Sequence, residues 1–162
     1  MNRRDAENAE REERGEKSES ENVNRSETNG GKNLGDEYNR LSHAIIGAAI
    51  EVHRSLVPGF LESVYEEALC IELQLRGIAF MRQFEIGIGY KGHTVGSGRV
   101  DVLVNNAIIV ELKAVDAIAP IHTAQVLSYL RVTGCKLGLL INFNVPILKD
   151  GVHRVALSAS LL

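Results

Sequence analysis

Residues 108–115, IIVELKAV, form the most apolar stretch of the sequence, yet they include Glu111 and Lys113. The run is far shorter than the roughly 20 apolar residues that span a bilayer. Its β-branched residues favour a buried strand, of the kind found in sheets flanked by helices. Leaving one charge there without its partner would cost on the order of 3–5 kcal/mol. The stretch therefore predicts a central strand in which the two charges either pair or line a cleft.

The first 40 residues have a composition that opposes folding. They hold 8 Lys or Arg and 11 Asp or Glu, but only six apolar residues. Such a segment buries too little apolar surface to offset the entropy lost on ordering. We expect residues 1–35 to be a disordered charged tail and residues 36–162 to be one domain with a single small core.

The net charge of −3 belongs to this tail, because the residues from Leu41 onward hold ten basic and ten acidic side chains. A neutral domain lacks the strongly basic composition typical of non-specific nucleic-acid binding, although a local basic patch is compatible with it. The N-terminus has no apolar segment of the signal-peptide type. Cys70 and Cys135 have the spacing of neither a zinc site nor a disulfide framework. We expect a cytoplasmic protein.

Apolar periodicity predicts two helices followed mainly by strands, because the period shortens from 3.6 to 2 after the second helix. Asn105 and Asn106 separate two strands as a hairpin turn. Gly92, Gly96 and Gly98 indicate turns around a second short run that follows the expected strand of residues 81–90. The expected helices are 36–54, 60–76 and 119–133, and the expected strands are 81–90, 99–104, 107–115, 137–143 and 152–158.

This order of elements, ααβββαββ, predicts an α/β fold in which helices flank a mixed sheet. One helix crosses over between strands, and the strands before it form an antiparallel meander. The core candidates are large apolar residues of the helices and strands. They are Ile45, Ile50, Leu69, Leu73, Leu139 and Ile141.

The hairpin decides whether Asp101 reaches Glu111, since alternate residues of a strand share a face. A two-residue loop would pair Val104 with Ala107 and would put Asp101 on the face away from Glu111. A three-residue loop over residues 104–106, or a bulge with the same effect, would put both on one face. We predict the latter, because an Asp buried alone would be costly and Asn tolerates the left-handed conformation that such loops need.

Asp101 and Glu111 on one face would form a site of hard oxygen ligands. Mg²⁺ prefers such ligands and is typically held by one or two carboxylates plus a substrate phosphate. An ion there would acidify a bound water and neutralise charge on a phosphoryl oxygen. Lys113 would stabilise charge on the phosphate or orient the attacking water. The alternative is a structural ion pair between Glu111 and Lys113 on a half-exposed edge.

Two helices supply further polar residues to this hypothesis. Glu62 and Tyr65 are three apart and share a helix face, so Glu62 is either a third carboxylate of the cleft or a residue that stabilises the first helical turn. Gln125 and Tyr129 are four residues apart. Either both reach the site, or Gln125 is solvated and Tyr129 packs in the core. His122 is interpreted as a cap or core-edge residue and receives no ligand role.

The stretch from Gly59 to Tyr65 reads G-x-x-E-x-x-Y. Together with Asp101, the strand carrying Glu111 and Lys113, and the later Q-x-x-x-Y helix, it resembles the bacterial GxxExxY protein family over residues 38–155. That family is similar to the PD-(D/E)xK nuclease superfamily, especially its RecB-like branch. The resemblance implies a restriction-endonuclease-like core of the order αβββαβ.

The resemblance also implies roles for individual residues. Val100 stands where these nucleases commonly have proline, which makes the match less specific. The implied cofactor is Mg²⁺ or Mn²⁺, and the implied partner is nucleic acid. Asp101 and Glu111 match the metal-binding acids and Lys113 the catalytic lysine, Glu62 matches the acid of the preceding helix, and Gln125 and Tyr129 match the auxiliary pair.

Two functions of different classes follow. The first is a Mg²⁺-dependent nuclease, with DNA as the expected substrate and with a homodimer providing enough surface to grip a duplex. The second is a non-catalytic module that keeps the nuclease-like fold and binds nucleic acid or protein, which the neutral domain charge and small size favour. Scattered basic residues form either a phosphate-contacting rim or solvated surface: Arg82, Lys91, Arg99, Arg131 and Lys136.

Overall fold

The computed structural model describes residues 34–157, so all but the last two residues of the predicted tail lie outside the described part. Within residues 34–157 the order of elements is the predicted one, with a short 3-10 helix added before the last strand. The helices are α2 (Leu34–Leu56), α3 (Glu62–Leu75), α4 (Pro120–Thr133) and the 3-10 helix η1 (Leu148–Gly151). The strands are β1 (Phe80–Tyr90), β2 (His93–Val104), β3 (Ile108–Lys113), β4 (Leu137–Asn142) and β5 (Val152–Ala156).

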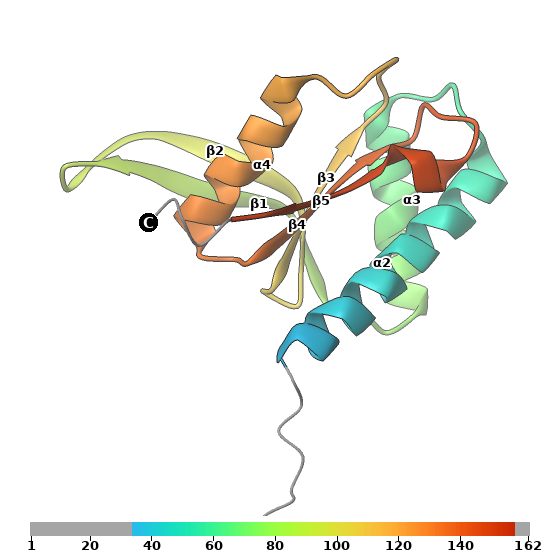
Figure 1. Cartoon of the computed structure of the whole chain (residues 1–162), viewed down its shortest axis with the longest axis horizontal. Helices are drawn as coiled ribbons and strands as arrows, with labels where there is room; N and C mark the ends of the chain where they lie inside the picture. The colour runs from blue at the N-terminus through green and yellow to red at the C-terminus, as the bar shows by residue number, and fades with distance from the viewer. Residues whose placement is uncertain (1–33, 158–162) are drawn as a thin grey trace, which may run out of the picture. The chain divides into compact units, whose positions relative to one another are not determined.

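The five strands form one mixed sheet in the order β1-β2-β3-β4-β5. Neighbouring strands are antiparallel except β3 and β4, which are parallel and joined through α4. A parallel pair needs such a crossover connection. Figure 1 shows α4 on one face of the sheet and α2 with α3 on the other. The predicted α/β fold is confirmed and is consistent with a restriction-endonuclease-like core.

Each face of the sheet has its own core. Ile108, Val110 and Leu112 of β3 pack with residues of α2 and α3, whereas Ile109 packs with Val126 of α4. Coverage on both faces explains why β3 is apolar at successive positions. Five of the six predicted core residues are buried, but Ile50 is 38% exposed. It lies off the stripe of Ile45, Ala48, Ala49 and Val52 that α2 turns towards the sheet.

The ends of helices and strands follow local chemistry, with one correction to the prediction. Helix α4 begins at Pro120, where the Ala119 N–H donates to His122 Nδ1 at 3.1 Å, so the capping interpretation of His122 is confirmed. The prediction that Gly96 and Gly98 form turns is wrong, because both lie inside β2; Gly92, with φ 81°, does occupy the turn. None of the helices within residues 34–157 has the length and hydropathy of a membrane-spanning segment.

Gly138 of β4 tests how tightly α4 packs on the sheet. A Cβ at this position would lie 2.5 Å from Val126 Cγ1. We expect Gly138→Ala to lower the free energy of unfolding by about 1–3 kcal/mol through overpacking. Urea denaturation measures this, and Gly87→Ala is the control because nothing lies within 4 Å of its added Cβ. Equal midpoints for the two variants would contradict the packing argument.

Candidate functional site

The β2–β3 hairpin has the parity that the sequence predicted, reached through the bulge alternative. Asn105 and Asn106 both have left-handed φ values, 49° and 53°, and the Ala107 N–H donates to the Val104 carbonyl at 2.9 Å. Val104 is nevertheless paired with Ile108, so Ala107 is an extra residue on the β3 side. The pairing continues to Val102 and Val110 and brings the next residues, Asp101 and Glu111, to one level.

A cleft of about 830 Å³ opens where this pairing ends. It receives residues from β2 and β3 in the sheet, from α3 on one face and from α4 on the other. All six residues that the sequence assigned to a site line it: Glu62, Asp101, Glu111, Lys113, Gln125 and Tyr129.

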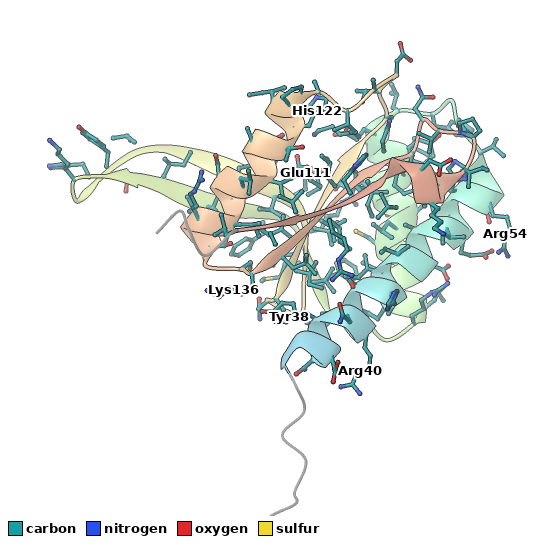
Figure 2. All side chains as sticks on the ribbon, viewed as in Figure 1. Tyr38, Arg40, Arg54, Glu111, His122 and Lys136 are labelled. Atoms are coloured by element: carbon teal, nitrogen blue, oxygen red, sulfur yellow. The ribbon has the colours of Figure 1, made fainter. Side chains whose placement is uncertain are left out.

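Glu111 and Lys113 form an ion pair at the end of β3. Glu111, labelled in Figure 2, shares the cleft with Gln125 and Tyr129 of α4. Lys113 Nζ donates to Glu111 Oε1 at 3.1 Å, and both side chains are largely buried, with 12% and 3% exposure respectively. Glu111 Oε2 is buried and has no hydrogen-bond partner among the described residues. A buried carboxylate oxygen of this kind is suited to accept a hydrogen bond or to bind a cation.

Burial and mutual repulsion make the carboxylates of the cleft weaker acids. Desolvation, followed by the charge of Asp101, raises the pKa of Glu111 to about 7, although Lys113 opposes the shift. Desolvation also raises the pKa of Asp101 and of Glu62. Burial lowers the pKa of Lys113, but Glu111 and the other carboxylates outweigh it and raise that pKa overall. The cleft therefore holds a protonated lysine among acids that would gain from a cation.

Asp101 is held by the strand opposite. Its Oδ2 accepts the Leu112 N–H at 2.8 Å, just past the last paired residues of β2 and β3. The same bond favours the ionised form, so it partly offsets the effect of burial on the pKa of Asp101. The Asp101 carboxylate thereby sits at the end of β3, next to Glu111.

Glu62 is positioned by the loop before α3, and Tyr65 holds that loop. The Tyr65 hydroxyl donates to the Val57 carbonyl at 2.7 Å and accepts the Phe60 N–H at 3.1 Å. Val57 has φ 54°, which a β-branched residue disfavours. Tyr65 itself is fully buried and stacks on Phe143, with 4.6 Å between ring centroids. The tyrosine of G-x-x-E-x-x-Y is thus a core residue, and of this motif's two side chains Glu62 alone lines the cleft.

Gln125 and Tyr129 form a pair on α4. Gln125 Nε2 donates to the Tyr129 hydroxyl at 2.9 Å, and both side chains line the cleft. A Cβ at Gly98 of β2 would lie 3.0 Å from Tyr129 Cε1. The glycine therefore allows the ring to lie close against β2, and the pair is kept at the cleft wall.

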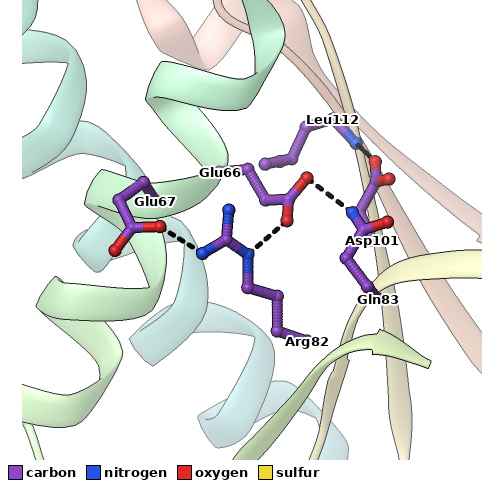
Figure 3. A network of polar contacts seen from close by, with 6 residues as sticks. All are labelled: Glu66, Glu67, Arg82, Gln83, Asp101 and Leu112. Atoms are coloured by element: carbon purple, nitrogen blue, oxygen red, sulfur yellow. Dashed lines mark hydrogen bonds and ion pairs between the residues drawn. The ribbon is translucent and has the colours of Figure 1, made fainter.

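A second polar network lines the cleft, and the sequence analysis did not predict it. Glu66 is buried and accepts bonds from Arg82 Nε at 2.5 Å and from Gln83 Nε2 at 2.7 Å, while Arg82 also pairs with Glu67 (Figure 3). The signal for Glu66 was available, because it lies one helical turn after Glu62 and faces the same side. Nothing in the sequence indicated that Gln83 would bond to it.

Asn142 also supports the site, although the sequence did not indicate it. It is buried at the end of β4, where its side-chain amide donates to the Val115 carbonyl at 2.8 Å and accepts the Val115 N–H at 3.1 Å. The Phe143 N–H donates to the Lys113 carbonyl at 2.8 Å. These bonds hold the end of β3, and with it Lys113, against β4.

The donor set of the cleft suits a hard divalent cation. Carboxylate oxygens are the ligands that Mg²⁺ and Mn²⁺ prefer, and Glu111 Oε2 is a buried oxygen without a hydrogen-bond partner among the described residues. Within residues 34–157, however, no three His, Cys, Asp or Glu side chains are gathered closely enough to hold an ion. Asp101 is turned to the Leu112 N–H and Glu111 to Lys113. The ligand assignment stays a prediction.

Comparison with known proteins agrees with the motifs. A sequence profile of the PD-(D/E)XK nuclease superfamily matches residues 39–155. No curated protein matches the chain. A solved structure titled "Crystal structure of SSO0001" is similar at 20% sequence identity and a TM-score of 0.43, over 60% of this chain and 52% of its own. This chain thus spans about half the length of that structure. The finer placement in the GxxExxY family and the RecB-like branch stays a prediction.

Tyr65→Phe tests the role of the hydroxyl in holding the loop before Glu62. The substitution leaves the Val57 carbonyl and the Phe60 N–H without their shared partner. We expect the free energy of unfolding to fall by about 1–3 kcal/mol, as measured by urea denaturation. Tyr90→Phe is the control, because Tyr90 is 62% exposed. A Tyr65→Phe variant as stable as the control would show that the loop does not depend on the hydroxyl.

Glu111→Gln tests the raised pKa through the pH dependence of stability. The native state binds a proton at Glu111 up to about pH 7, because burial raises the pKa of this carboxyl, whereas the unfolded chain releases the proton near the ordinary pKa of 4.5. Stability is therefore lost as pH rises through this window, by roughly 3 kcal/mol from this group. With EDTA present, Glu111→Gln should flatten the fall between pH 4.5 and 7, whereas Glu51→Gln on the surface of α2 should not. A parent-like slope in Glu111→Gln would contradict the assignment.

Proposed function

We propose that this chain, which belongs to the PD-(D/E)XK nuclease superfamily, hydrolyses phosphodiester bonds of nucleic acid with Mg²⁺ or Mn²⁺ as cofactor. DNA is the proposed substrate, and a homodimer is the proposed form in which so small a domain grips a duplex. One observation supports this above the others. The elements α3, β2 and β3 bring Glu62, Asp101, Glu111 and Lys113 to a single cleft, where a buried oxygen of Glu111 lacks a partner among the described residues.

Each residue of the cleft has a proposed role. Glu62, Asp101 and Glu111 would hold the divalent ion. When bound, such an ion supplies charge neutralisation and an acidified water. Lys113 is a protonated donor rather than a base, because its pKa is raised, so it would stabilise negative charge on the phosphate or orient the water.

Gln125 and Tyr129 complete the proposed site as an auxiliary pair. Their mutual hydrogen bond leaves one N–H of the Gln125 amide for a substrate, since Nε2 carries two donors. The pair lies on α4, across the cleft from Glu62 on α3. It is therefore suited to orienting a phosphate group or an adjacent nucleotide.

A specific observation supports the alternative of a non-catalytic binding module. The carboxylates are engaged internally, Asp101 by the Leu112 N–H and Glu111 by Lys113, and no three acids are gathered around one point in the described part of the chain. A third, narrower possibility is that the Glu111–Lys113 pair is purely structural. Both make the same prediction about hydrolysis, which is that none occurs.

Hydrolysis by the Glu111→Gln variant decides between these functions. We expect the parent protein to cleave labelled single-stranded DNA, duplex DNA or RNA only with Mg²⁺ or Mn²⁺. We expect Glu111→Gln to lose at least about 100-fold in rate, as when a preorganised group at a reaction centre is removed. Glu51→Gln, which changes an exposed carboxylate paired with Arg54, should keep the parent rate.

Metal titration separates a failed nuclease from a binding module. Calorimetry should detect saturable Mg²⁺ uptake by the parent protein and its loss in Asp101→Asn. If none of the nucleic acids is cleaved and no uptake occurs, the catalytic proposal is wrong. Nucleic-acid binding that is unchanged in Glu111→Gln would then support the non-catalytic module.

A further inference from the structure

The cationic side chains of the cleft differ in whether an acidic side chain pairs with them. Three line it, Arg82, Arg99 and Lys113. Arg82 is paired with Glu66 and Glu67, and Lys113 is paired with Glu111. Arg99 is exposed, stands opposite Glu85 of β1 and favours the ionised form of Asp101 through its charge, but its guanidinium makes no hydrogen bond or ion pair with any residue of the range 34–157. It is therefore the cation of this cleft whose donors are available to a ligand.

The side of the sheet that β2 residues face reverses between Val102 and Val100, next to Arg99. Val100 and Val102 are two residues apart on β2 and would share a face in a regular strand. Instead, Val102 packs in the α2–α3 core and Val100 in the α4 core. Leu103 also packs in the α4 core, so without the reversal Arg99 would share that side with it.

The reversal coincides with a local backbone distortion at Gln83. This residue has φ 51°, a conformation that residues other than glycine rarely adopt inside a strand. The β1–β2 register pairs Arg82 with Val102 and then Phe84 with Val100, so that Gln83 and Asp101 stand opposite each other at the omitted step. The bond from Gln83 Nε2 to Glu66 Oε2 holds this conformation against α3. Asp101 thus lies at the distorted step, and Arg99 lies two residues beyond it on β2.

A polyanionic ligand in this cleft needs a cationic side chain that offsets the negative charge of the lining residues. Five acidic side chains line it and would repel a nucleic-acid backbone: Glu62, Glu66, Glu85, Asp101 and Glu111. Arg82 and Lys113 are already neutralised by their partners. An arginine presents a planar fork of donors that matches two phosphate oxygens.

We infer that Arg99 binds a backbone phosphate of the nucleic acid that enters the cleft, beside the carboxylates. The inference rests on the proposed function for the class of ligand, and it adds the residue that grips the ligand. Because a phosphate contact carries no sequence information, Arg99 contributes to affinity equally for all sequences. Binding through Arg99 does not require hydrolysis.

Fluorescence anisotropy with labelled DNA, in EDTA so that binding is measured without turnover, tests this. The probes are a single-stranded oligonucleotide and a duplex of the same sequence, each titrated at several salt concentrations. Arg99→Gln should weaken binding of the probe that the parent binds by about 10-fold and reduce the slope of log K against log salt by about 0.7–0.9, the value for one lost phosphate contact. Arg99→Lys should keep the salt slope and recover part of the affinity, because it retains the charge without the fork.

Arg131→Gln is the matched control, since Arg131 is exposed on α4, does not line the cleft and carries the same charge. Parent-like affinity in Arg99→Gln, or an equal loss in Arg131→Gln, would overturn the inference. Arg99-dependent binding without any cleavage would retain it and refute the nuclease. Cleavage by the parent with unchanged affinity in Arg99→Gln would refute the inference and retain the nuclease, and no binding of either probe by the parent would overturn the inference.

Discussion

The burial of Glu111 at the end of β3 is the interaction on which the rest of the site depends. A carboxylate placed among apolar residues costs free energy unless it is paired. Lys113 satisfies one of its oxygens and none of the described residues satisfies the other. Asp101 adds a second negative charge that opposes ionisation of the first. The cleft thus holds two acids whose charges oppose each other, and one buried oxygen of Glu111 has no partner within residues 34–157.

The neighbouring elements are arranged to keep this costly group in place. Asn142 and the Phe143 N–H hold the end of β3 to β4, and the Leu112 N–H holds the Asp101 carboxylate beside it. Tyr65 closes the loop that brings Glu62 to the same cleft. These contacts use backbone groups that are freed where strand pairing and helices end, so the site lies where regular hydrogen bonding stops. The contacts that stabilise the end of β3 and the residues of the candidate site therefore lie at the same end of the sheet.

Much of the fold and of the candidate site could be predicted because it depends on local rules. Apolar periodicity indicated each α-helix and each strand of residues 34–157, and the alternation along β3 placed Glu111 and Lys113 together. The need to bury Asp101 with a partner predicted the odd parity of the hairpin, which the extra residue Ala107 provides. By contrast, glycine composition misled, because Gly96 and Gly98 allow β2 to continue, and Gly98 also makes room for Tyr129.

The sequence by itself determined the order of elements, the apolar central strand and the set of acids, lysine and Gln–Tyr pair that line one cleft. Only the tertiary structure decided that Tyr65 belongs to the core, that Glu66 bonds to Gln83 and that the facing of β2 reverses between Val100 and Val102. The physical reason is that periodicity reports which side of one element is apolar, whereas these features arise from contacts between elements far apart in the chain. The left-handed backbone of Gln83, opposite Asp101 and bonded to α3, has no local signature in an ordinary glutamine.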